Sequence, residues 1–326
     1  MSLCEKESML EKKILCGKLS LSIRRATFGE LMLALDWAKR EGWNPCAVEA
    51  EAKALYALDP KGFFGVFLED SMVAFMTAVT YVANPRFAHI GIFIVKNGCR
   101  SIGVGKLLMD HVKRYLESSG VRTIYLNAVT NQVTWYRTFG FEVVCDNLTY
   151  VSTDRKILPS RGRKEVGILE SSKDLLFESM CVFDSLYWGA DRSKFLGKLL
   201  DQRNAFACVQ KDKNSKIVGY GMIRPRQKGY RVGPLYSKNS SGFEKILRAL
   251  VGKISMDESI YIDVSKNNES RADFLLSDEF GFKREDSVFT VFMAYSGDSG
   301  ASTQTSTKCM AIESLEVGGP AIYRKQ

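Results

Sequence analysis

Short runs rich in Val, Ile, Phe, Met and Thr, bounded by turn residues, mark strands in the first half of the chain. These runs are residues 62–69, 72–82, 88–95 and 123–128. The first two flank the turn Glu69-Asp70-Ser71 and predict a hairpin, and the third is apolar on both faces, which favours a central strand. Residues 105–118 carry apolar side chains at helical spacing, so we expect a helix that ends at Gly120.

The second half repeats this order of predicted elements. A hairpin, a strand, a helical stripe and a further strand are expected at residues 206–223, 230–236, 243–254 and 260–263. Ile260-Tyr261-Ile262-Asp263 matches Ile124-Tyr125-Leu126-Asn127, and Phe280-Gly281-Phe282 matches Phe139-Gly140-Phe141. The shared order and these matches indicate an internal duplication.

Length agrees with a duplicated chain, because 326 residues suffice for two domains of about 150 residues each. Basic residues cluster around position 160, and Gly, Ser and Thr dominate residues 296–307. We therefore expect an N-terminal extension (1–20), a first domain (21–151), a linker (152–165), a second domain (166–295) and a disordered tail (296–326).

The composition predicts a soluble globular protein, with 45% hydrophobic and 25% charged residues. The longest nearly apolar run, Met72 to Ala83, is too short to cross a bilayer, and the charged N-terminus does not match a signal peptide. We expect a cytoplasmic protein without a membrane partner, with the nucleus as the alternative compartment. The oligomeric state is left open between monomer and homodimer.

Two classes of chemistry lack the residues that they need. The eight cysteines include no Cys-x-x-Cys pair, and His89 and His111 are the only histidines. A structural zinc site needs clustered Cys and His, and a Ser or Cys hydrolase usually needs a histidine base. We therefore expect neither a metal site nor hydrolase chemistry.

The net charge of +9 is concentrated in one region, because residues 201–250 hold 11 basic and 3 acidic side chains. Arg224, Arg226, Lys228 and Arg231 lie around one predicted turn. Our preferred interpretation is a solvated hairpin, with an anion site as the alternative. A local patch of this kind does not predict a nucleic-acid partner.

The segment Arg100-Ser101-Ile102-Gly103-Val104-Gly105-Lys106 follows a predicted strand and opens a predicted helix. Glycines permit close approach of a ligand, and the free amides of a helix's first turn bind anions, so a pyrophosphate suits this loop. No Ser or Thr follows Lys106, and Leu108 replaces the third glycine of a dinucleotide fingerprint. The alternative is a tight strand-to-helix turn.

In this segment the chain resembles the GNAT acetyltransferase superfamily, whose cofactor motif is matched by Arg100, Gly103 and Gly105. The resemblance covers roughly residues 21–150 and continues through Asn127, Asn131, Tyr136 and the Phe-Gly-Phe sequence. The region around Trp37 and Trp43 resembles a two-domain subgroup with a degenerate second unit. The resemblance implies an α+β fold of tandem GNAT-like units, each a central mixed, mostly antiparallel sheet flanked by helices.

The resemblance also implies acetyl-CoA as the cofactor. Backbone groups of Phe93, Ile94 and Val95 would hold the pantetheine arm and the acetyl group. The pyrophosphate would bind the loop, whose members are Arg100, Ser101, Ile102, Gly103, Val104, Gly105 and Lys106. Asn131 would contact the cofactor arm, and Tyr136 would stand near the sulfur as acid or sulfur ligand, with core packing as its alternative role.

Candidates for the base and the acceptor pocket are less closely tied to a motif. His89 could act as the base or be a core residue, and Asp263 could face a shared cleft or cap a loop. The acceptor could contact Trp37, Trp43, Asn127, Tyr187 and Trp188, with Asp184 and Arg192 beside the last two; core packing is the alternative. The second unit has Ser240-Ser241-Gly242-Phe243-Glu244 in place of the motif, so we expect one cofactor site.

We therefore expect an N-acetyltransferase that moves an acetyl group from acetyl-CoA to a primary amine of a small molecule or peptide. The amine would attack the thioester directly in a ternary complex, which needs no nucleophilic side chain. A catalytically silent acyl-CoA-binding regulatory module and a protein lysine acetyltransferase are the alternatives. The sequence does not identify the amine.

Overall fold

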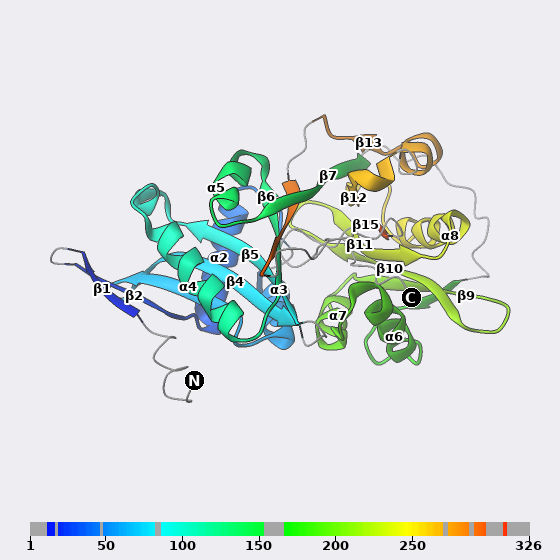
Figure 1. Ribbon diagram of the computed structural model, residues 1–326. Coiled ribbons are helices and arrows are strands. Elements are labelled where there is room, and N and C mark those ends of the chain that lie inside the picture. Colours follow the sequence, from blue (N-terminus) through cyan, green and yellow to red (C-terminus); the bar gives the residue numbers. More distant parts are fainter. Residues whose placement is uncertain are drawn as a thin grey trace.

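One mixed β-sheet runs through both halves of the chain and forms the frame of the molecule (Figure 1). The computed structural model describes residues 12–16, 19–45, 48–81, 86–152, 166–269, 273–286, 290–297 and 309–311. Residues 1–11 of the expected N-terminal extension, 153–165 of the linker and most of the expected tail lie outside this description. The domain boundaries stay a prediction.

The first half of the chain forms a sheet with helices on both faces. Its strands are β1 (Lys12–Cys16), β2 (Leu19–Arg25), β3 (Phe63–Leu68), β4 (Ser71–Tyr81), β5 (Phe87–Val95), β6 (Thr123–Val129) and β7 (Glu142–Ser152). Its helices are α2 (Phe28–Arg40), α3 (Val48–Leu58), α4 (Val104–Ser118) and α5 (Val133–Arg137), with single 3-10 turns at Asn97–Cys99 and Thr130–Gln132. The strands and helix predicted between residues 62 and 128 are confirmed.

A capping box fixes the start of α2. The Thr27 side chain accepts a hydrogen bond from the Glu30 amide, and the Glu30 carboxylate accepts one from the Thr27 amide at 2.7 Å. Both donors would otherwise lack partners in the first turn of the helix. The start of α2 is therefore set locally.

The second half contains β8 (Val166–Leu169), β9 (Phe206–Lys211), β10 (Ile217–Pro225), β11 (Tyr230–Ser237), β12 (Ile260–Ser265), β13 (Lys283–Arg284), β14 (Thr290–Ser296) and β15 (Cys309–Ala311). Its helices are α6 (Phe177–Trp188), α7 (Ser193–Leu200) and α8 (Ser240–Val251), with a 3-10 turn at Lys266–Asn268 and a π-helical segment at Asp273–Glu279. Within the expected tail, β15 pairs with β11.

The strand pairing confirms that the two halves share one plan. β4 pairs antiparallel with β5, which pairs parallel with β6, and α4 connects β5 to β6. β10, β11 and β12 have the same relations, with α8 as their connecting helix. Each half is thus a mixed sheet of the same order.

The parts of the sheet that belong to the two halves are joined by an exchange of strands. β14, from the end of the second half, lies between β6 and β7 and pairs antiparallel with both (Figure 1). β7, from the end of the first half, pairs in turn with β12. Each half is therefore completed by a strand of the other.

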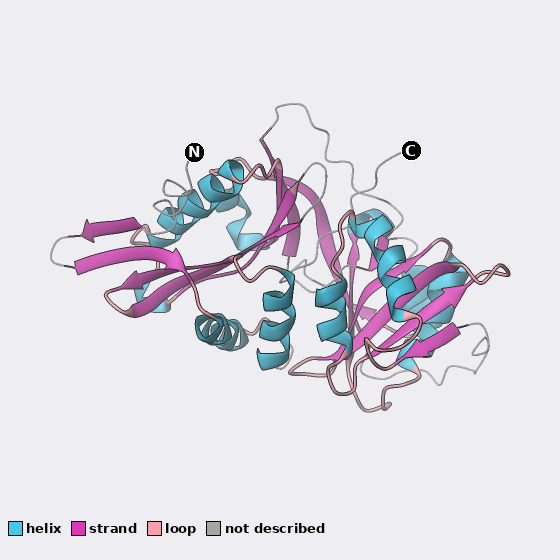
Figure 2. Ribbon diagram, turned by 90° about the horizontal axis from the view of Figure 1, so that it is seen from below, coloured by secondary structure: helices cyan, strands magenta, loops and turns pink. Residues whose placement is uncertain are grey.

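The helices α2 and α3 of the first half share a hydrophobic core with α6 and α7 of the second. α3 and α7 lie side by side between the halves (Figure 2). Two further cores lie under α4 and under α8. None of the helices in the described part of the chain is long and apolar enough to span a membrane.

Candidate active site

The candidate site is a cavity of about 780 Å³ that opens where β5 and β6 diverge. The parallel pairing of these strands extends only to Ile90 and Leu126. Ile92 then adopts φ +42°, and the register between β4 and β5 shifts at the same level. This bulge turns the end of β5 away from β6, as bulges do next to many active sites.

The N-terminus of α4 forms one wall of the cavity. Gly103 is its N-cap residue with φ +88°, a conformation that favours glycine, and no side chain caps the first turn. A Cβ on Gly105 would lie 3.3 Å from the Phe93 ring and 3.4 Å from a Val95 methyl group. Glycine therefore lets α4 approach β5 and leaves the amides of its first turn available to an anion.

Most residues expected to bind the cofactor line this one cavity. They are Phe93, Ile94, Val95, Arg100, Ser101, Gly103, Gly105, Lys106, Asn131 and Tyr136. The side chains of two others do not line it, because Val104 is buried under α4 and Ile102 is 69% exposed to solvent.

The Arg100 side chain braces the cavity rim. Its Nε donates to the Val95 carbonyl at 2.8 Å, and its Nη2 donates to Glu41 Oε1 at 2.6 Å. Glu41 is the C-cap residue of α2, so this ion pair connects the loop before α4 to the end of α2. Lys106 forms a separate ion pair with Asp110 at 2.8 Å.

Tyr136 projects from α5 into the cavity wall and is 8% exposed. Its ring packs edge to face against Trp135 and Phe141. Its hydroxyl has no hydrogen-bond partner among the described residues. Burial raises the pKa of Tyr136, which keeps the phenol protonated at neutral pH.

A short chain of polar side chains contributes to the cavity lining. Asn127 accepts a hydrogen bond from Asn147 Nδ2 at 2.8 Å, and the same amide nitrogen donates to Thr290 Oγ1 at 3.0 Å. Asn127 and Thr290 both line the cavity, together with Trp43 and Glu41. Sequence reasoning missed Thr290, which comes from the exchanged strand β14, and Glu41.

Neither expected candidate for the base lines the cavity. His89 is buried with both ring nitrogens unpaired among the described residues, and burial lowers its pKa to about 3. Asp263 lies on β12, where it forms an ion pair with Arg231 and accepts a hydrogen bond from Thr149 at 2.8 Å. The Asp263 carboxylate therefore connects β12 to β11 and β7.

Three expected acceptor contacts also lie in hydrophobic cores outside the cavity lining. Tyr187 stacks on Tyr236 with ring centroids 5.3 Å apart, and Trp188 packs edge to face on Tyr81. Trp37 packs against the core shared by α2, α3, α6 and α7. This packing agrees with the alternative role in a core, because aromatic residues can line a pocket or pack in a core and the sequence alone does not separate the two.

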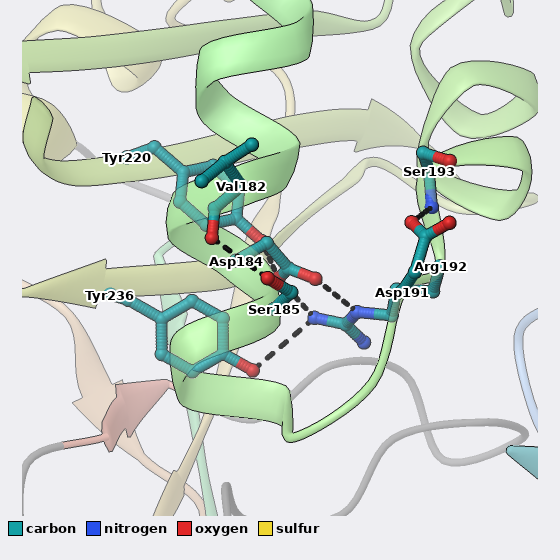
Figure 3. A network of polar contacts seen from close by, with 8 residues as sticks. All are labelled: Val182, Asp184, Ser185, Asp191, Arg192, Ser193, Tyr220 and Tyr236. Atoms are coloured by element: carbon teal, nitrogen blue, oxygen red, sulfur yellow. Dashed lines mark hydrogen bonds and ion pairs between the residues drawn. The ribbon is translucent and has the colours of Figure 1, made fainter. Parts of the chain in front are cut away.

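Asp184 and Arg192 form a buried network instead of a pocket wall (Figure 3). The Arg192 guanidinium donates to both carboxylate oxygens of Asp184, at 2.8 and 2.7 Å. The Tyr220 hydroxyl also donates to Asp184, and Arg192 donates to the Tyr236 hydroxyl at 3.3 Å. Burial, together with the Asp184 charge, raises the pKa of Tyr220. These contacts tie α6 to β10 and β11.

The basic hairpin that we expected to be solvated is largely buried, because it docks on the first half of the chain. Arg226 Nε donates to the Asn44 carbonyl at 2.7 Å, and Arg226 Nη1 lies 3.7 Å from Glu51. The Gln227 amide donates to the Pro45 carbonyl at 2.9 Å. The hairpin thus holds the loop that carries Trp43.

The second half has no equivalent open helix terminus. The Asn239 side chain caps α8 by accepting a hydrogen bond from the Gly242 amide at 2.7 Å. A Cβ on Gly242 would lie 2.3 Å from Gln210 Oε1, so the space before this helix is filled. Of these two helix starts, α4 therefore has an uncapped first turn beside a cavity, and α8 does not.

Comparison with known proteins yields matches over both halves of the chain. Residues 29–141 match the model of the acetyltransferase (GNAT) family, and residues 180–306 match that of an acetyltransferase (GNAT) domain. The chain is 25% identical over 297 residues to the holothin acyltransferase of Pseudoalteromonas sp. (strain SANK 73390), covering 90% of this chain and 93% of that protein.

Solved structures share the fold. One from Pyrococcus horikoshii aligns with a TM-score of 0.71 at 19% identity, covering 94% of this chain and 98% of that one. A tandem GNAT protein from the clavulanic acid biosynthesis pathway aligns with a TM-score of 0.58 at 13% identity, covering 86% and 99%.

Proposed function

We propose that this chain, which belongs to the GNAT acetyltransferase family, transfers an acetyl group from acetyl-CoA to a primary amine of a small molecule or peptide. The observation that carries the proposal is the uncapped N-terminus of α4 in the wall of the cavity between β5 and β6. The name of the curated relative, holothin acyltransferase, supports a small-molecule acceptor.

The residues of the cavity fit an acyl-CoA. The amides at the start of α4 would bind the pyrophosphate, because they combine free donors with the positive end of the helix dipole. Past Ile90, β5 keeps β4 as its neighbour and has no ladder with β6, so backbone groups of Phe93–Val95 face the cavity. When bound, the cofactor supplies the activated acyl thioester.

Within this cavity we assign Tyr136 as the acid that protonates the departing thiolate. Its raised pKa keeps the phenol protonated at neutral pH, so a proton is available when the thiolate leaves beside it. The phenol has no competing partner among the described residues. Tyr136 therefore favours an enzyme over a silent binding module.

The ammonium proton of the acceptor has no dedicated base among the described residues of the cavity wall. Glu41 is the one carboxylate that lines the cavity, and Arg100 already engages it at 2.6 Å. His89 lies outside the lining. We therefore assign this proton to solvent, so that the free-base fraction of the amine limits the rate below its pKa of about 10.

The experiment is an assay of thiol release from acetyl-CoA across a panel of primary amines. We expect turnover with at least one amine and an acetylated product of the expected mass. Tyr136→Phe should lower turnover, whereas the exposed Tyr56→Phe should not. Tight binding of acetyl-CoA without thiol release from any amine would favour the binding module.

A further inference from the structure

One buried positive charge in the described part of the chain has no buried partner. The buried charged side chains comprise four arginines and three acids: Arg192, Arg224, Arg226, Arg231, Glu51, Asp184 and Asp263. Three ion pairs join Arg192 to Asp184, Arg226 to Glu51 and Arg231 to Asp263. Arg224 is left over.

Arg224 is completely buried, and all three guanidinium nitrogens lack a hydrogen-bond partner among the described residues. An unpaired buried charge is unfavourable by several kcal/mol, because its hydration is lost and nothing replaces it. A bound anion would restore both the charge balance and the hydrogen bonds. A planar guanidinium suits a carboxylate, which it can bind with two parallel bonds.

The position of Arg224 in the sheet links it to the cavity by two routes. Tyr220 and Met222 on β10 pack in the core under α6 and α7, so alternation places Arg224 on the same face. Two residues further on, Arg226 binds the loop of Asn44, next to the cavity residue Trp43. This first route follows the docked hairpin.

The second route crosses the sheet. Arg224 lies opposite Arg231 in the ladder, and Arg231 pairs with Asp263, which Thr149 contacts. Two residues before Thr149 on β7, Asn147 binds the cavity residue Asn127. A row of polar side chains therefore connects the cavity to Arg224.

We propose that Arg224 binds the carboxylate of the acceptor, so that the acceptor is an amine that carries a carboxylate, as amino acids and peptides do. This inference rests on the proposed acetyl transfer. Arg231 does not take this role, because Asp263 already balances its charge. Arg224 is 0% exposed and is not among the residues that line the cavity, so the proposal requires the acceptor site to extend from the cavity to this guanidinium.

The first test compares matched amines, each amino acid or dipeptide with its C-terminal amide, in the thiol-release assay. The wild type should favour the carboxylates. Arg224→Met should lower kcat/KM for the carboxylates by about 10- to 100-fold, as for a lost charged hydrogen bond, and leave the amides unchanged. The exposed Lys213→Met is the matched control and should change neither series.

The inference would be overturned if Arg224→Met lowered kcat/KM equally for the carboxylates and the amides. It would also be overturned if the wild type did not prefer the carboxylates. A carboxylate on the acyl group is the other source of this anion. Turnover of a dicarboxylic acyl-CoA that depends on Arg224, with no preference among acceptors, would place the anion there and also overturn it. If Arg224→Met does not fold, Arg224→Lys, which keeps the charge without the paired donors, replaces it.

Thermal unfolding separates a failure here from a failure of acetyl transfer. A panel of N-acetyl amino acids should raise the Tm of the wild type but not of Arg224→Met, and the matching N-acetyl amides should raise neither. These compounds need no turnover, so the result holds even if no amine is acetylated. An equal Tm response of both proteins to the carboxylates would contradict a role for Arg224.

Discussion

Tyr136 is the residue on which the chemistry depends most. Burial raises the pKa of its phenol, so the protonated form that acts as acid persists to higher pH than for a free tyrosine. The wild-type rate should rise with pH as the amine loses its proton and should show no descending limb below about pH 10.

Replacing Tyr136 with Phe should lower kcat by about 100-fold, the lower range for a positioned proton donor. The Kd for acetyl-CoA should stay within a few-fold, because the ring and its packing remain. Steady-state kinetics from pH 6 to 10 measure both effects. Unchanged kcat at every pH would exclude the acid role.

His89 should make the fold less stable in acid. Its pKa falls from an ordinary value of 6.5 to about 3 on folding, so the unfolded chain binds the proton between these values. Stability is therefore full above about pH 6.5 and decreases as the pH falls, by about 2 kcal/mol at pH 5. Urea unfolding at pH 7.5 and 5.0 should show this loss in the wild type.

In His89→Leu, the part of the acid sensitivity due to this imidazole should disappear. The difference in unfolding free energy between pH 7.5 and 5.0 should then shrink by about 2 kcal/mol relative to the wild type. An equal pH dependence in both proteins would mean that His89 titrates normally in the folded state.

Individual residues could be predicted from the sequence where the local backbone geometry requires one residue type. Gly103 and Gly105 were predicted because a positive φ and a close approach each demand glycine. The burial of Arg224 was not predicted, because it depends on which distant elements cover the hairpin. The positions of charged residues in a sequence do not show which of their side chains are buried.

Among the elements, the hairpin between β10 and β11 positions a wall of the site. Arg226 contacts Asn44 and Glu51, and Asn44 exchanges two hydrogen bonds with the backbone of Lys228, at 2.9 and 3.2 Å. These contacts hold the end of the loop that contains Trp43. The hairpin is a positioning element.

Removing Arg226 should loosen this wall and remove the buried ion pair with Glu51. We expect Arg226→Met to lower the unfolding free energy by about 3 kcal/mol, as when one member of a buried pair is lost. The KM for the amine should rise while the Kd for acetyl-CoA stays unchanged. Unfolding and kinetics on the same preparation measure both.

The double variant Arg226→Met with Glu51→Leu is the control. It removes both charges and should recover most of the lost stability, but not the KM, because the bond to Asn44 stays absent. If the KM for the amine also returned to the wild-type value in the double variant, Arg226 would act only through the stability of the fold.

The periodicity predicted α4 and α8, because each of these helices presents one apolar face to a core. The cavity's bulge at Ile92 was not predicted, because an isoleucine at φ +42° gives no signal in the sequence. The strand exchange also escaped prediction. We did not predict β14 itself, and only tertiary packing selects β6 and β7 as its neighbours.

For the whole molecule, the exchange makes each half dependent on the other. The continuous sheet and the core shared by α2, α3, α6 and α7 leave no plane along which the halves could unfold separately. Calorimetry of the full chain should therefore show one cooperative transition. Two resolved transitions would contradict this coupling.

The central claim is that one acyl-CoA site lies at the N-terminus of α4. Gly103→Glu adds a carboxylate where the pyrophosphate would bind and strains a residue at φ +88°. Gly98→Glu makes the same charge change outside the cavity lining, where an added Cβ meets no atom within 4 Å.

Calorimetric titration with acetyl-CoA tests this claim most directly. We expect one site per chain in the wild type and in Gly98→Glu, and no measurable binding in Gly103→Glu. Two sites, no site in the wild type, or unchanged binding in Gly103→Glu would contradict the account.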